Sequence, residues 1–295
     1  MELEFIVKDE NYFNIKEVLK VHFEISDRLL IKLKKNKKIY LNNTPAYVDK
    51  QIKQGDIIKI DMNFEEESEN IIPIEMNLNI IFEDNYLLII NKPAGIPVHP
   101  SIAHYKNSLS NGVKYYFNTI GLNKKIRPVN RLDKDTSGIV IFAKHEYIQE
   151  HLIKQMKTSI FKKEYQAILT GHLTNKNGKI AAPIARKDGS IIEREINFET
   201  GENATTYYMV LNEFYINNTP LSLVNFLLET GKTHQIRLHS KYLGNPIIGD
   251  TLYGKESDLI NRQALHAYKI SFIHPISKEN IILEIDLPDD MKKIL

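Results

Sequence analysis

The sequence predicts an α+β fold, in which a largely antiparallel mixed sheet is flanked by helices and preceded by a small α+β unit. In the longer, C-terminal part, strand-like segments follow one another through turn signals such as Asn177-Gly178 and Asp188-Gly189. Few segments there have helical periodicity, so alternating βαβ units are not expected. Around residues 63–75 a basic segment gives way to the acidic run FEEESEN and then to a proline, which is typical of a linker.

We therefore expect a small domain at residues 1–62, a linker at residues 63–75 and a larger domain at residues 76–295. A chain of 295 residues is long enough for two cores, and its hydrophobic content of 42% and charged content of 26% are those of a globular protein. The absence of cysteine excludes disulfides and thiolate-bound zinc and fits a reducing cytosol. The sequence has neither a signal-peptide pattern nor a run of about eighteen apolar residues, so we expect a cytoplasmic protein with no membrane segment.

The small domain is expected to contain two helices and two short strands. The segment FNIKEVLKVHF has apolar residues at helical spacing: Ile15, Val18, Leu19 and Phe23. The segment SDRLLIKLKKNKK predicts a second helix, which begins at a capping Ser26 or Asp27. The segments KIYLNN and DIIKIDM predict short strands.

Positive charge is concentrated in this small domain, although the net charge of the chain is only +2. Between Arg28 and Lys59 there are nine basic residues and two acidic ones. This segment is either a solvated face, as many charge runs are, or a surface whose lysines release counterions from a phosphate backbone. The candidate RNA-binding residues are Arg28, Lys32, Lys34 and Lys35.

The larger domain is expected to consist mainly of strands. The segments NYLLIINKP and GIVIFAK predict buried strands, and HEYIQEHLIKQM predicts a helix with apolar residues at every fourth position. The segment KEYQAILTG alternates, with Tyr165, Ala167 and Leu169 on one face.

The segment NRLDKDTSG places several polar side chains directly before the apolar run IVIFAK. A calcium loop that starts at Asp133 would need a glutamate at its twelfth position, where the chain has Lys144, so this interpretation fails. A structural turn explains the aspartates and the hydroxyl groups but not Arg131. Alternatively, Asp133 is a reactive carboxylate that a nearby guanidinium holds ionised. The turn and the active site both remain open at this point.

A second polar concentration lies in TGKTHQIRLHSKYLGNPIIGDTLYG. It predicts a helix over residues 234–243 with Thr233 as its cap. His234 and His239 are five residues apart, so they do not form the paired zinc ligands of an HExxH helix, and we expect them to cap or to pack. Arg237, near the helix start, could clamp a carboxylate or a phosphate.

Sequence signatures of common cofactors are missing. The chain has no GxGxxG, no GxxxxGK[ST] and no GxSxG motif. We therefore expect chemistry that uses a carboxylate and arginines, with neither a metal nor an organic cofactor.

Together these segments resemble the pseudouridine synthases of the RluA type. The resemblance runs, in the family's order, through LLIINKPAGIPVHPS, RLDKDTSGIVIFAK, KKEYQAILTG, TGKTHQIRLHSKYLGNPIIGDTLYG and QALHAYKISFIHP. It covers nearly all of the chain after the linker. The first domain, with LKKNKKIYLNN and QGDIIKID, is similar to the RNA-binding domain named after small-subunit ribosomal protein four.

The resemblance implies isomerisation of uridine to pseudouridine in RNA without a cofactor. Asp133 matches the family's essential aspartate, and whether it attacks the ribose or acts on an intermediate stays open. Arg131 matches the arginine expected to help extrude the nucleotide and fill the vacated stack. Tyr165 matches the tyrosine expected to stack on the extruded uracil and assist proton removal. Arg237 matches the basic residue expected to pair with the aspartate.

One position departs from the family, which usually has histidine where this chain has Asn130. If that position shapes the loop, asparagine can replace the histidine; if it grips the extruded nucleotide, turnover would be weaker. The alternative functions are an RNA-binding or ribosome-assembly protein with a weakened active site and a glycoside hydrolase, which would need a second carboxylate. We expect a monomer that acts on ribosomal RNA rather than transfer RNA, by analogy with the family.

Overall fold

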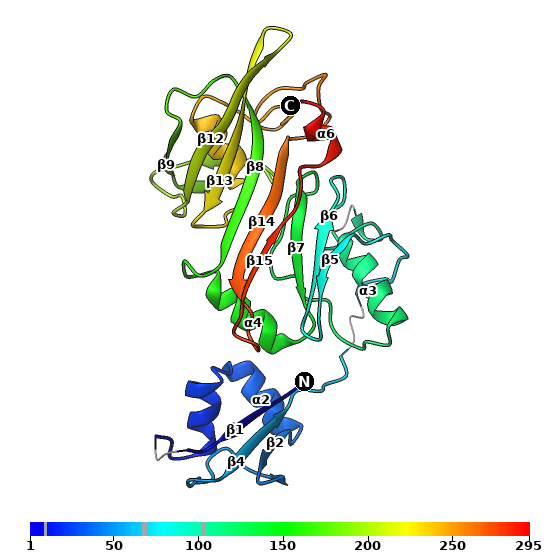
Figure 1. The fold of residues 1–295 in the computed structure, drawn as a ribbon, viewed down its shortest axis with the longest axis vertical. Helices are drawn as coiled ribbons and strands as arrows, with labels where there is room; N and C mark the ends of the chain where they lie inside the picture. Colours follow the sequence, from blue (N-terminus) through cyan, green and yellow to red (C-terminus); the bar gives the residue numbers. More distant parts are fainter. Residues whose placement is uncertain (9–10, 67–69, 102–103) are drawn as a thin grey trace.

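The structure is a computed structural model that describes residues 1–8, 11–66, 70–101 and 104–295. It contains a small N-terminal sheet and a nine-stranded sheet with helices packed on it (Figure 1). In the large sheet every strand pair is antiparallel except β14 (Leu265–Ile273) with β7 (Ser137–Ala143), which is parallel. The predicted α+β fold with a largely antiparallel mixed sheet is therefore confirmed.

The large sheet has the strand order β5-β6-β7-β14-β8-β13-β12-β9, with β15 beside β14. Its other strands are β5 (Ile80–Glu83), β6 (Leu87–Lys92), β8 (Lys162–Thr170), β9 (Asn177–Ala181), β12 (Thr205–Ile216), β13 (Thr219–Leu228) and β15 (Asn280–Glu284). A separate hairpin of β10 (Ile184–Arg186) and β11 (Arg194–Ile196) turns near Gly189, as predicted. The expected turn at Asn177-Gly178 is wrong, because both residues lie within β9.

The N-terminal unit is a four-stranded antiparallel sheet with its helices packed on it. Its elements are β1 (Glu2–Ile6), α1 (Ile15–Glu17), the π-helical segment η1 (Val18–His22), α2 (Asp27–Lys35), β2 (Ile39–Leu41), β3 (Thr44–Pro45) and β4 (Ile57–Asp61). The first predicted helix is therefore divided into an α-helical and a π-helical turn, although its predicted apolar residues are all buried. Ser26 caps α2, since its hydroxyl accepts the N–H of Leu29 at 3.2 Å.

Four helices accompany the large sheet: α3 (Leu109–Thr119), α4 (Glu146–Gln155), α5 (Gln235–Tyr242) and α6 (Asp289–Lys292). Helix α4 was predicted, whereas α3 was not, although Asn111 closes a capping box with Ser108 at its start. In the part of the chain that the structure describes, none of the helices has the length and apolar character needed to span a bilayer.

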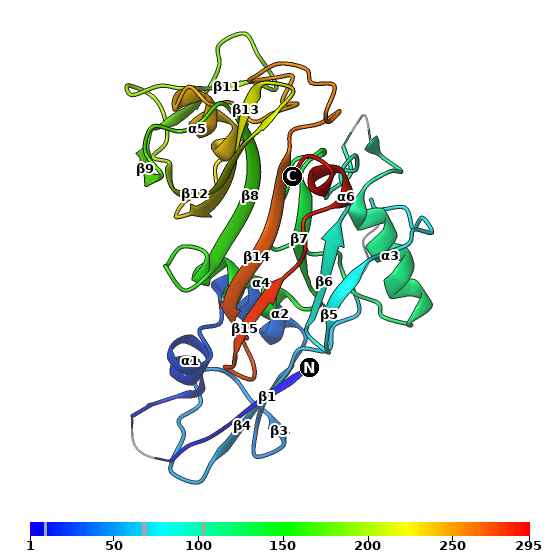
Figure 2. The ribbon, with the colours of Figure 1, turned by 45° about the horizontal axis from the view of Figure 1, so that its top comes forward.

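Helix α4 lies between the large sheet and the N-terminal unit (Figures 1 and 2). Its Ile148 and Leu152 share one buried cluster with Phe23 of the N-terminal unit. The hydroxyl of Ser26 donates to Glu150 of α4 at 2.7 Å. Because α4 follows the end of β7, the N-terminal unit lies at the opposite end of β7 from the NRLDKDTSG segment.

Candidate active site

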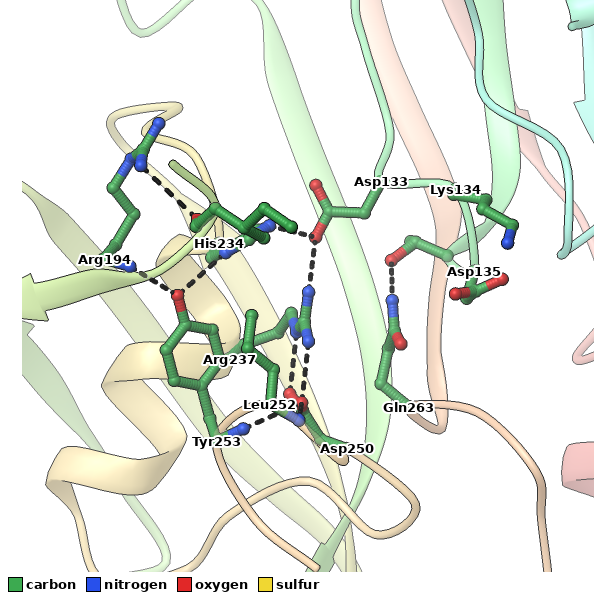
Figure 3. Close-up of polar contacts among 12 residues, drawn as sticks. Asp133, Lys134, Asp135, Arg194, His234, Arg237, Asp250, Leu252, Tyr253 and Gln263 are labelled. Atoms are coloured by element: carbon green, nitrogen blue, oxygen red, sulfur yellow. Dashed lines mark hydrogen bonds and ion pairs between the residues drawn. The ribbon is translucent and has the colours of Figure 1, made fainter. Parts of the chain in front are cut away.

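Asp133 lies in the turn that leads into β7. Its backbone carbonyl accepts the N–H of Thr136 at 3.1 Å, so the backbone does form a turn. Its carboxylate points out of that turn, with Oδ2 at 3.3 Å from Nη1 of Arg237 and 3.8 Å from Nε2 of His234 (Figure 3). The turn interpretation therefore fits the backbone, while the side chain is directed into a polar cluster.

Arg237 is held in place by a second carboxylate, Asp250, which is only 1% exposed. The guanidinium donates from Nε and Nη2 to the two oxygens of Asp250, both at 2.7 Å, and turns Nη1 toward Asp133 (Figure 3). Burial works against the charge, but the hydrogen bonds and charge of Asp250 outweigh it and raise the pKa of Arg237. Arg237 is therefore a fixed cation that presents one N–H group to Asp133.

His234 takes part in the same cluster, in contrast to the expected capping or packing role. Its Nδ1 lies 2.8 Å from the hydroxyl of Tyr253, whose oxygen accepts the N–H of Arg194 at 2.8 Å. The Tyr253 proton is then available to Nδ1, which places the imidazole proton on Nε2, the atom that faces Asp133. Burial lowers the pKa of His234, which favours this neutral form.

Helix α5 starts one residue later than predicted. Its N-cap is His234, not Thr233, and His234 has a left-handed backbone with φ of +59°. The His234 Nδ1 lies against the Tyr253 hydroxyl instead, and no side-chain cap bond forms. His239, by contrast, packs inside, with Nε2 at 3.0 Å from the carbonyl of Ala182, as expected.

Tyr165 and Arg131 line the pocket beside Asp133. Tyr165 is buried, and burial together with the charge of Asp133 raises its pKa well above the ordinary value, so the phenol stays protonated at neutral pH. Arg131 is exposed, and among the described residues it makes no ion pair. Its guanidinium is therefore free to contact a bound molecule.

Asn130 shapes the loop rather than pointing into the pocket. Its side-chain amide donates to the carbonyl of Ile139 at 2.9 Å and its side-chain oxygen accepts the N–H of Ile141 at 2.8 Å. The side chain thus bonds to the backbone of β7 as a neighbouring strand would. Of the two roles considered for this position, the geometry fits loop shaping.

Lys92 holds the Asp133 turn in place. This role was not predicted, because in the sequence Lys92 is only the end of a predicted strand. It is fully buried, and its ammonium donates to the carbonyls of Pro93, Ile96 and Lys134 at 2.8–2.9 Å. These three bonds tie the turn to the segment after β6. Burial lowers the pKa of Lys92 from 10.5 to about 7, partly offset by the charges of Asp135 and Asp133.

The lowered pKa of Lys92 predicts a pH-dependent stability. Between pH 7 and 10.5 the unfolded chain binds the Lys92 proton and the folded chain does not, so the free energy of unfolding should rise with pH. Relative to Lys92→Met, the wild type should gain up to about 1.4 kcal/mol per pH unit in this window. Urea titrations at several pH values measure the difference, and parallel profiles for the two proteins would contradict the assignment.

A basic groove continues from this pocket. It has a volume of about 800 Å³, and its lining includes four cations and one carboxylate: Arg131, Lys163, Arg194, Lys232 and Asp133. Such a groove attracts a polyanion and repels a basic protein surface. Within the described ranges, no group of three or more histidine or acidic side chains is placed to hold a metal ion.

The predicted basic residues of α2 lie in two different environments. Arg28 and Lys32 face α4, each 3.3 Å from a carboxylate oxygen of Glu146, and Lys32 also pairs with Glu66. Lys34 and Lys35 are exposed and, among the described residues, have no carboxylate partner. The ammonium of Lys32 is thus engaged inside the protein, whereas the other two lysines face solvent.

The fold and the site together are those of an enzyme. Its pocket contains a carboxylate paired with an arginine and a buried tyrosine, and it opens into a groove whose positive charge suits a polyanion. A model of the RNA pseudouridylate synthase family matches residues 86–242. The uncharacterized RNA pseudouridine synthase YhcT of Bacillus subtilis is 40% identical over 94% of this chain and 90% of that protein. The ribosomal large subunit pseudouridine synthase D of Blochmanniella floridana is 35% identical over 88% of this chain and 86% of that protein.

A solved structure has the same fold. Human RNA pseudouridylate synthase domain containing 1 has a TM-score of 0.59 and 26% sequence identity, over 71% of this chain and 83% of that chain. The chain belongs to the RNA pseudouridylate synthase family, within the RluA type that its motifs resemble. It is an isomerase that converts uridine in RNA to pseudouridine.

Proposed function

We propose that the protein isomerises specific uridines of large-subunit ribosomal RNA with Asp133 as the nucleophile. The observation that carries this proposal is the position of the Asp133 carboxylate, 3.3 Å from an arginine that Asp250 holds rigidly. A guanidinium at this distance attracts the carboxylate and aligns it in the pocket. The names of relatives that act on the large ribosomal subunit support the choice of RNA.

The other pocket residues take the roles that the family implies. The target base leaves its stack, and the face of Tyr165 stacks on the extruded uracil. Because its pKa is raised, the Tyr165 phenol enters the reaction protonated, so it assists proton removal as a relay: its oxygen takes up the proton from the carbon while its own proton passes to water. Arg131, which is exposed and free, fills the vacated place in the RNA.

The first domain, residues 1–62, is proposed to bind RNA as a domain of the small-subunit ribosomal protein four type, joined by the linker at residues 63–75. Lys34 and Lys35 support this role because they are exposed and unpaired within the described chain. The seven residues of β7 separate this domain from the Asp133 turn by about 20 Å. An RNA that contacts both must span at least this distance.

The two alternatives have less support. The RNA-binding protein with a weakened active site was motivated by Asn130, but this side chain bonds to β7 and leaves the pocket intact. A glycoside hydrolase needs a second carboxylate that can exchange protons or activate water. Asp250 is the other carboxylate bonded to Arg237, and both of its oxygens accept N–H groups of that guanidinium.

The substrate is tested by incubating the purified protein with total RNA from a strain that lacks it. Pseudouridine is then mapped by chemical adduct formation and primer extension. We expect new stops in large-subunit ribosomal RNA. Stops confined to transfer RNA would overturn the proposed substrate, and tight, salt-sensitive binding without any new stop would favour the binding-protein alternative.

A further inference from the structure

Lys163 lies in the basic groove next to the catalytic pocket. It precedes Tyr165 by two residues on β8, and both side chains line the groove. Alternate residues of a strand point to the same face, about 7 Å apart along the chain. The Lys163 side chain is half-buried, and burial is the one cause that shifts its pKa, which it lowers.

The ammonium of Lys163 has no hydrogen-bond or ion-pair partner among the residues that the structure describes. Lys92 shows how this fold treats a structural buried lysine, because three carbonyl oxygens accept its three protons. A desolvated charge without a partner is unfavourable. An anion that enters the groove would therefore be bound by Lys163 with little competition from the protein.

Two of the other cations of the groove are already engaged. Arg194 donates to the carbonyl of Glu193 at 3.1 Å, and Lys232 pairs with Glu202. Gly231 lies directly against Lys163, since a Cβ atom at this position would come within 2.9 Å of the Lys163 Nζ. The absence of a side chain at this position leaves the ammonium accessible from the groove.

We propose that Lys163 binds a phosphate of the RNA backbone beside the nucleotide that enters the pocket of Asp133 and Tyr165. The proposal rests on the proposed function and adds a phosphodiester subsite to it. RNA presents one phosphate per nucleotide, and a lysine ammonium binds phosphate as a point charge without reading the base. The contact would fix the target nucleotide along β8 while Tyr165 holds its base.

The test compares Lys163→Met with Lys162→Met, the matched control. Lys162 is adjacent and exposed, so its replacement removes the same charge from the opposite face of β8. Binding of a short oligouridylate is measured against salt concentration. We expect Lys163→Met to weaken binding about tenfold at low salt and to reduce the slope of log K against log salt by about 0.7. Lys162→Met should stay close to wild type, and Lys163→Arg should restore most of the affinity.

Thermal unfolding of the free protein separates this role from a structural one. Because Lys163 is desolvated and unpaired, Lys163→Met should unfold at the wild-type temperature or above it. A lower unfolding temperature, or binding equal to that of Lys162→Met, would overturn the subsite. These comparisons need no turnover, so failure of the subsite is distinguishable from failure of the proposed function, which is seen in the pseudouridine map of the wild type.

Discussion

Replacing Asp250 by alanine is expected to lower the free energy of unfolding by about 3–5 kcal/mol and to abolish isomerisation. The change leaves the buried guanidinium of Arg237 without its two strongest acceptors. It also removes the acceptor of the N–H groups of Leu252 and Tyr253, each at 3.1 Å. Without Asp250, Arg237 can turn fully toward Asp133 or leave it, and either movement destroys the alignment.

Denaturant unfolding and single-turnover pseudouridine formation measure the two effects of Asp250→Ala. The control is Asp258→Ala, an exposed aspartate of the same loop, which should be as stable and active as wild type. The double variant Asp250→Ala with Arg237→Met should be more stable than Asp250→Ala alone, because no buried charge is left unpaired. Equal stability of Asp250→Ala and Asp258→Ala would contradict the role of Asp250 in holding Arg237.

Replacing Tyr165 by phenylalanine should slow isomerisation about a hundredfold or more while stability stays within about 0.5 kcal/mol of wild type. The Tyr165 hydroxyl makes no hydrogen bond with the described residues, so its loss removes no structural contact. RNA affinity should also persist, because phenylalanine keeps the stacking face. A wild-type rate for Tyr165→Phe would show that the hydroxyl takes no part.

The matched control for Tyr165→Phe is Tyr208→Phe, a buried tyrosine on β12 outside the lining of the catalytic pocket. It should leave both rate and stability unchanged. Since the pKa of Tyr165 is raised, the wild-type rate should show no tyrosine ionisation up to about pH 10. A loss of rate at a lower pH that Tyr165→Phe abolishes would contradict a protonated phenol.

The fold class could be predicted because most of its elements have a clear local period. The buried strands β6 and β7 and the helix α4 all follow apolar patterns. Helix α3 was missed because its first turn buries polar residues, Ser110 and Asn111. They are satisfied by distant carbonyls, those of Val98 and Ile72, and such tertiary contacts leave no periodic signal.

The polar cluster could be predicted only in part. Asp133 and Arg237 stand out in the polar motifs, but the contact between their side chains joins positions 104 residues apart. Asp250 follows a glycine, and a Gly-Asp pair is typical of an exposed turn, so the sequence does not indicate that this carboxylate is buried. His234 was expected to cap or to pack, because its spacing from His239 does not suit a zinc site. Its left-handed backbone, which is uncommon at a non-glycine residue, has no sequence signature.

The basic residues of α2 show a different limit of prediction from sequence. A run of lysines reveals the charge of a helix but not which side chains find a carboxylate elsewhere in the protein. Lys32 does so at the junction of the two units, where Glu66 and Arg127 form a further pair at 2.8 Å. Burial raises the pKa of Glu66, whereas its partners Arg127 and Lys32 lower it. The partners have the larger combined effect, and the pKa is lowered to about 2.

The most direct test of the account is single-turnover pseudouridine formation by Asp133→Asn on the mapped target RNA. Asp135→Asn is the matched control, because Asp135 belongs to the same loop but points away from Arg237 (Figure 3). We expect Asp133→Asn to bind the RNA and form no measurable pseudouridine, while Asp135→Asn retains most of the wild-type rate. Pseudouridine formation by Asp133→Asn at the rate of Asp135→Asn would contradict the assignment of Asp133 as the catalytic carboxylate.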